Sequence, residues 1–132
     1  MDVLIENGRV LTPDGFEDVS VAIEDGVIAS VGSSVNSTRQ RIDARGAYVL
    51  PGLIDIHGDA FERQLMPRPG VHFPLDIALM ETDKQLVANG ITTAYHGVTL
   101  SWEPGLRSAD AFREFMRVHE GLKPHYTSDV RL

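Results

Sequence analysis

Apolar and polar side chains alternate along the first fifty residues of the chain. Within residues 19–24 every second side chain is a branched apolar one, and this period of two is typical of a sheet with one buried face. Tight turns need residues that adopt positive φ, and three dipeptides supply them: Asn7-Gly8, Asp14-Gly15 and Asp25-Gly26. We therefore expect a hairpin over residues 19–31 and a small β unit over residues 1–50.

The pattern changes at Pro51-Gly52 and becomes an alternation of strands and helices, which predicts an α/β domain over residues 51–132. A capping box, Thr82-Asp83-Lys84-Gln85, predicts the start of a short helix that ends at Asn89-Gly90. Ser108 is suited to cap a second helix. The expected strands lie at 53–56, 91–98 and 126–132, and a proline-rich loop lies at 66–70.

Three parallel strands joined by two crossovers would leave a long sheet edge and an uncovered apolar face. A stable monomer should not tolerate this. We therefore expect that residues 1–132 are a fragment of a longer protein, or that another chain completes them.

Composition excludes several classes of function. The net charge is −7, which argues against nucleic acid or an anionic membrane as a partner. There is no cysteine, so disulfides, thiolate metal sites and cysteine nucleophiles are excluded. The chain has no basic start followed by a long apolar stretch, so we expect a cytoplasmic protein without a membrane anchor.

The segment Leu50-Pro51-Gly52-Leu53-Ile54-Asp55-Ile56-His57-Gly58-Asp59 carries the clearest chemistry. In an extended strand Asp55, His57 and Asp59 would share one face at the strand's carboxyl end. A divalent cation is an efficient partner for such a group. The alternative is a solvated strand end with two acids, and spacing alone leaves both interpretations open.

A hairpin-rich β unit followed by PGLIDIHGD and βα repeats resembles the N-terminal third of the amidohydrolase superfamily. The resemblance implies a small β-sandwich followed by the first βα units of a (β/α)8 metal-dependent hydrolase barrel, which is incomplete in this chain. The usual first-strand motif of that family is His-x-His, whereas this chain has His57-Gly58-Asp59. A carboxylate in place of the second imidazole keeps a viable ligand and adds negative charge at the metal.

The His-x-Asp form resembles one branch of that superfamily, the diphosphatases that cleave a ribose 5-triphosphate in phosphonate metabolism. Further residues carry this likeness: Phe61-Glu62-Arg63, Met66-Pro67-Arg68-Pro69-Gly70, Asn89-Gly90-Ile91-Thr92-Thr93 and Trp102-Glu103-Pro104-Gly105. The resemblance implies release of pyrophosphate from a small phosphorylated sugar. It also implies a divalent metal, Zn with Mn, Fe and Ni as alternatives.

We expect His57 and Asp59 to be metal ligands, and Asp55 to support them by hydrogen bonding rather than by ligation. Arg63 and Arg68 are expected to contact phosphate, because a guanidinium can hold a phosphate through two parallel hydrogen bonds. The alternative is that these two arginines lie on the surface and form ion pairs with Glu62 or Asp76. His96 is expected to line the substrate pocket, although ligand and core roles stay open for it.

The remaining histidines and the lysines carry less information. His72 could join the arginines but is more simply an exposed loop residue, His119 falls on the apolar stripe of a helix, and we assign no function to His125. Neither Lys84 nor Lys123 matches the carboxylated lysine that bridges two metals in many amidohydrolases. That lysine, further histidines and the general base are expected beyond Leu132, so this chain alone should be inactive.

Two other functions stay open. One is another hydrolase of the same superfamily that cleaves a different bond: an amidase, a cyclic-amide hydrolase or a deaminase. The other is a non-catalytic scaffold, for which the missing second imidazole would be the first sign of ligand loss. The sequence leaves the oligomeric state open, homo-oligomers included.

Overall fold

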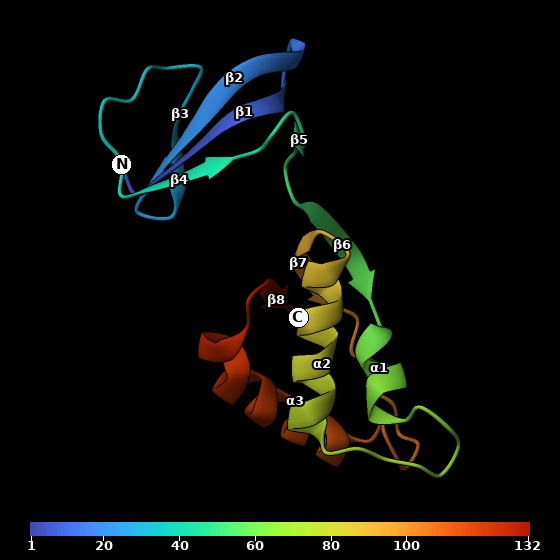
Figure 1. The fold of residues 1–132 in the computed structure, drawn as a ribbon. Helices are drawn as coiled ribbons and strands as arrows, with labels where there is room; N and C mark the ends of the chain where they lie inside the picture. The colour runs from blue at the N-terminus through green and yellow to red at the C-terminus, as the bar shows by residue number, and fades with distance from the viewer. The chain divides into compact units, whose positions relative to one another are not determined.

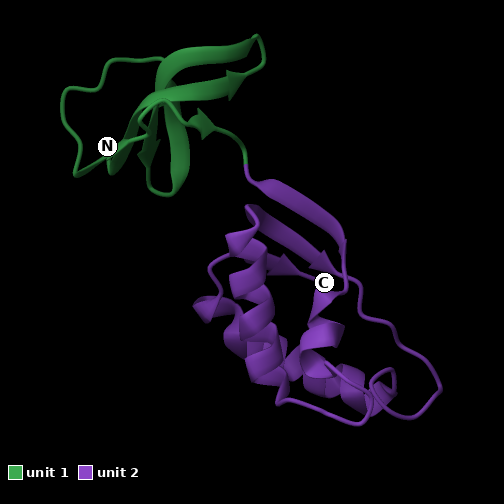
Figure 2. Cartoon of the chain, turned by 45° about the vertical axis from the view of Figure 1, so that its right-hand side comes forward, with its two compact units in different colours: residues 1–51 green, residues 52–132 purple.

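The computed structural model describes residues 1–132, which divide into two compact units, Met1–Pro51 and Gly52–Leu132 (Figure 2). None of the helices is both long enough and apolar enough to cross a membrane.

The first unit is a five-stranded sheet (Figure 1). Its strands are β1 (Val3–Thr12), β2 (Gly15–Glu24), β3 (Val27–Val31), β4 (Gln40–Asp43) and β5 (Tyr48–Val49). They are ordered β3-β2-β1-β4, and β5 also pairs with β1. The two N-terminal hairpins are antiparallel, whereas β4 and β5 run parallel to β1.

The hairpin expected over residues 19–31 is confirmed. Asp25 and Gly26 form its turn with φ values of 50° and 76°, as the tight turns that join antiparallel strands require. Asn7-Gly8, by contrast, was wrongly predicted to be a turn. Asn7 has a φ of 58° inside β1, where the pairing with β2 shifts register between Ile5 and Gly8, because a positive φ serves a β-bulge as well as a turn.

The second unit has three parallel strands in the order β6-β7-β8 with helices between them (Figure 1). The strands are β6 (Leu53–Gly58), β7 (Ile91–His96) and β8 (Asp129–Arg131). The helices are α1 (Ala60–Leu65), α2 (Leu75–Ala88), α3 (Ala109–Leu122) and a 3-10 turn, η1 (Lys123–His125). Helix α1 was not expected from the sequence.

Two small clusters of buried side chains hold this unit together. The first cluster joins α1, α2 and α3 through Phe61, Leu79 and Phe115. The second packs α2 against the strands through Leu86, Ala94 and Val130. The edge strand β6 is poorly covered, since Ile56 is 80% exposed. The uncovered apolar surface expected for a short parallel sheet is therefore present.

Helix boundaries match the local signals only in part. The hydroxyl of Ser108 accepts a hydrogen bond from the Ala111 N–H at 3.2 Å, so the expected N-cap of α3 is confirmed. The capping box at residues 82–85 was a wrong prediction, because α2 begins at Leu75. Thr82 lies in the middle of the helix, and its hydroxyl donates to the Ala78 carbonyl at 2.8 Å.

Candidate functional site

The carboxyl ends of β6 and β7 meet at one edge of the parallel sheet. Gly58 pairs with His96 in the register of the two strands, and the Gly97 N–H donates to the Gly58 carbonyl at 2.9 Å. The segment His57-Gly58-Asp59 is therefore brought beside His96, although the two are separated by helices in the sequence. The carboxyl edge of parallel strands is where barrels of this kind build their active sites.

His57 and Asp59 are both exposed at this edge. The carboxylate of Asp55 accepts a hydrogen bond from the His57 main-chain N–H at 3.0 Å, through Oδ1. This contact holds the backbone that carries the His57 imidazole, and the role of Asp55 in supporting a metal ligand remains a prediction.

The expectation that Asp55, His57 and Asp59 share one strand face needs a correction. Strand β6 ends at Gly58, and Asp59 takes φ −127° and ψ 7° as the residue that precedes α1. A register shift also lies between Asp55 and Gly58. The alternation of an ideal strand therefore stops before Asp59, whose direction is set by the start of the helix.

His96 is 5% exposed and packs against Phe61, with ring centroids 5.0 Å apart. Its Nδ1 atom is buried and has no hydrogen-bond partner. Burial lowers the pKa of His96, and the nearby His119 acts in the same direction, whereas the Gly58 backbone and Asp55 oppose the shift. Because little of its surface is open to a substrate, its burial favours a role inside the protein, and the pocket-lining role remains a prediction.

The residues at this edge fit part of a divalent-metal site. Imidazole nitrogen and carboxylate oxygen are suitable ligands for Zn and similar ions. The Asp59 side chain makes no capping hydrogen bond, so its oxygens are available. No group of three or more His, Asp or Glu side chains in residues 1–132 is arranged to hold a metal. The chain thus offers His57 and Asp59 as two candidate ligands, and their ligation remains a prediction.

The two arginines expected to bind phosphate follow β6 directly. Arg63 lies in the last turn of α1, and Arg68 begins a tight turn in which the Val71 N–H donates to the Arg68 carbonyl at 3.0 Å. Gly70 has a φ of 78° in that turn, a conformation for which glycine after proline is suited. Both arginines are exposed, and the expected alternative, pairing with Glu62 or Asp76, is not observed.

Sequence reasoning missed Arg107. With Glu62, Met66 and His72 it lines a cavity of about 400 Å³ beside the segment that follows α1. The neighbouring Trp102-Glu103-Pro104-Gly105 segment was noted in the sequence and could have drawn attention to this arginine.

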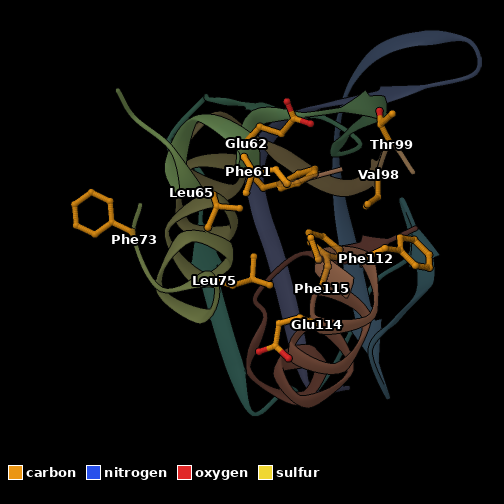
Figure 3. Close-up of a pocket in the computed structure, with 12 residues that line it drawn as sticks. Phe61, Glu62, Leu65, Phe73, Leu75, Val98, Thr99, Phe112, Glu114 and Phe115 are labelled. Atoms are coloured by element: carbon orange, nitrogen blue, oxygen red, sulfur yellow. The ribbon is translucent and has the colours of Figure 1, made fainter. Parts of the chain in front are cut away.

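A second cavity, of about 310 Å³, lies between α1, α3 and the segment after β7 (Figure 3). Its lining is mainly apolar, with Phe61, Leu65, Val98, Phe112 and Phe115 among the contributors. It contains no basic side chain, so it is unsuited to a phosphate group.

Comparisons with known proteins give several relatives, although no family model matches the chain. The chain is 30% identical over 98 residues to the alpha-D-ribose 1-methylphosphonate 5-triphosphate diphosphatase of Escherichia coli (strain K12), a match that covers 74% of this chain and 26% of that enzyme. It is 44% identical over 57 residues to a D-hydantoinase of Rhizobium radiobacter, covering 43% of this chain and 12% of the relative.

A solved structure of D-hydantoinase aligns with a TM-score of 0.66 and 27% identity, covering 89% of this chain and 24% of that structure. The chain therefore spans about a quarter of these relatives' length, or less. The shared architecture identifies the fold as a β-rich unit followed by βα units of an incomplete (β/α)8 barrel. On these grounds the chain belongs to the amidohydrolase superfamily.

Proposed function

We propose that the whole protein is a metal-dependent hydrolase that cleaves a phosphoanhydride bond of α-D-ribose 1-methylphosphonate 5-triphosphate and releases pyrophosphate. The observation that carries this proposal is the similarity to the Escherichia coli diphosphatase over 74% of the chain. The exposed arginines that follow the candidate metal strand agree with it, because a triphosphate needs several cationic partners.

In this proposal His57 and Asp59 hold a divalent metal, Zn or alternatively Mn, Fe or Ni. Such a metal supplies a hydroxide near neutral pH and polarises the phosphoryl oxygen. The general base and the other ligands would come from outside residues 1–132. Asp55 keeps the His57 backbone in place through its 3.0 Å hydrogen bond.

The triphosphate would lie against the segment that follows β6. Arg68 is held at the start of a turn between Pro67 and Pro69, which limits its backbone freedom. Arg63, on α1, and Arg107, in the 400 Å³ cavity with His72, would extend the basic surface.

Steady-state assays of the whole protein with this triphosphate test the proposal. We expect pyrophosphate as the product, and Arg68→Ala should raise KM about tenfold, because a charged hydrogen bond contributes about 1.5 kcal/mol or more. Arg113→Ala is the matched control, since Arg113 is exposed on α3 and pairs only with Asp110. Release of orthophosphate alone, or equal effects of both substitutions, would contradict the proposal.

A second candidate is hydrolysis of a cyclic amide. It is favoured by the 44% identity to a D-hydantoinase and by the TM-score of 0.66 to a solved D-hydantoinase. Turnover of hydantoin, allantoin or dihydroorotate by the metal-loaded protein, without pyrophosphate release from the triphosphate, would select this candidate.

A further inference from the structure

Gly58 lies where two polar side chains converge. A Cβ atom at this residue would be 3.1 Å from Nδ1 of His96 and 3.3 Å from Oδ2 of Asp55. The Tyr95 carbonyl oxygen would also be 3.3 Å away. The absence of a side chain at Gly58 therefore leaves one small space that the Asp55 carboxylate and the His96 imidazole share.

At this space Asp55 can accept a hydrogen bond and the His96 imidazole can donate one. Oδ1 of Asp55 already accepts the His57 N–H at 3.0 Å, and its second oxygen faces the space beside Gly58. Nδ1 of His96 faces the same space, buried and without a partner. An unsatisfied buried polar atom costs about 1–3 kcal/mol, so a side-chain rotation that joins the two groups would remove this cost.

Packing limits where the imidazole can go. The Phe61 ring lies against His96 with centroids 5.0 Å apart. The Gly58 carbonyl is the competing acceptor: it accepts the Gly97 N–H at 2.9 Å and has a second lone pair. The Asp55 carboxylate brings an oxygen to the same space beside Gly58 that Nδ1 of His96 faces.

We propose that His96 and Asp55 are a pair of positioning residues: the Nδ1–H of His96 donates to Asp55, and Asp55 in turn holds the main chain of His57. Strand β7 thereby fixes the metal-bearing end of β6. This inference rests on the proposed function only in taking His57 and Asp59 as metal ligands, and it does not depend on the substrate. It explains why a polar side chain is buried beneath Phe61, and why the residue between the two candidate ligands is a glycine.

Zinc affinity of the whole protein tests the pair without an activity assay. Metal content is measured by elemental analysis after dialysis against graded concentrations of a chelator. His96→Phe, which keeps a ring but removes Nδ1, should lower zinc affinity about tenfold, the usual effect of losing an outer partner of a ligand. His96→Asn, whose amide can donate from nearly the same position, should restore most of it.

His119→Phe is the matched control, because His119 is another buried histidine of this unit and is 1% exposed. It should alter stability and leave zinc affinity unchanged. If His119→Phe lowers zinc affinity as much as His96→Phe does, the effect is general loosening and the proposal is overturned.

A double substitution identifies the acceptor. Asp55→Asn keeps an oxygen for the His57 N–H and removes the charge, so it should weaken zinc binding by itself. Combined with His96→Phe it should cost little more than either substitution alone. Fully additive losses would instead indicate the Gly58 carbonyl as the partner, and would overturn the pair.

Two further outcomes separate this inference from the proposed function. A whole protein that takes up no zinc would overturn the inference, since the positioned site would not exist. A protein that shows the expected coupling but releases no pyrophosphate would refute the diphosphatase proposal and support the positioning pair.

Discussion

Asp83 offers the sharpest test of how the second unit is held together. Its side chain lies in the middle of α2 and is 2% exposed. The carboxylate accepts hydrogen bonds from the N–H groups of Thr127 and Ser128, each at 2.9 Å, and from the Ser128 hydroxyl. A single carboxylate thus fixes the segment that leads into β8.

The expected loss on removing this carboxylate follows from the contacts. Hydrogen bonds to a charged group contribute about 1.5–3 kcal/mol each, so three of them at the lower value give about 4.5 kcal/mol for Asp83→Ala. Ser128→Ala, which removes only the hydroxyl contact, should cost about 1.5 kcal/mol. Glu81→Ala is the control on the same helix, since its exposed pair with Lys84 should contribute less than about 1 kcal/mol.

Urea denaturation followed by far-ultraviolet circular dichroism measures these differences in the free energy of unfolding. If Asp83→Ala costs no more than Glu81→Ala, the carboxylate does not anchor the segment before β8, and the reasoning is wrong.

The pH dependence gives an independent check on Asp83. Burial alone would raise the pKa of its carboxyl, but the hydrogen bonds from Ser128 and Thr127 together outweigh burial and lower that pKa. The folded-state pKa of Asp83 therefore lies below its unfolded-state pKa of about 3.9. The stabilisation is fully present above the unfolded-state pKa and is lost as the pH falls through the folded-state pKa. The difference in stability between the wild type and Asp83→Asn should therefore be constant from neutral pH to about pH 5 and shrink below about pH 4.

Two more predictions concern this unit. Gly52→Ala should destabilise it by at least about 1 kcal/mol in urea denaturation, because the new Cβ would lie 2.0 Å from the Thr92 hydroxyl oxygen. Gly121→Ala, in a helix with open space at that position, should stabilise it by about 0.5–1 kcal/mol. Unchanged stability in Gly52→Ala, or a loss of stability in Gly121→Ala, would contradict the corresponding prediction. Burial, and then the charge of Lys123, lower the pKa of His119, so unfolding takes up a proton and stability should fall as the pH drops below about 6.5. His119→Gln should remove part of that acid sensitivity in denaturation at pH 7.5 and 5.5, and an unchanged slope would count against a buried neutral imidazole.

The candidate metal ligands could be proposed from the sequence alone. PGLIDIHGD is recognisable because an apolar run followed by a histidine and carboxylates is a local pattern. Asp55 was expected to support its neighbours by hydrogen bonding, and its bond to the His57 N–H spans only two residues. The burial of His119 also followed from helical spacing, and the structure confirms it.

The parts that were missed depend on partners far along the chain. Asp83 lies within the segment that has the form of a capping box in the sequence, yet its hydrogen-bond partners are 44 and 45 residues away. The buried, unpartnered Nδ1 of His96 becomes visible only when β6 and β7 are side by side. Arg107 lines one cavity with His72 and Met66, although about 35 to 40 residues separate it from them in the sequence.

By itself, the sequence determined the features that arise from short-range physical preferences. These are the hairpin at Asp25-Gly26, the cap at Ser108, the alternation of strands and helices after Pro51, and the position of the candidate ligands His57 and Asp59 at the end of a strand. Only the tertiary structure decided which polar groups share a buried space and where Asp59 leaves the strand. The physical reason is that periodicity and turn preferences act over a few residues, whereas the pairing of buried polar groups depends on parallel strands that the chain brings together only after a helix has intervened.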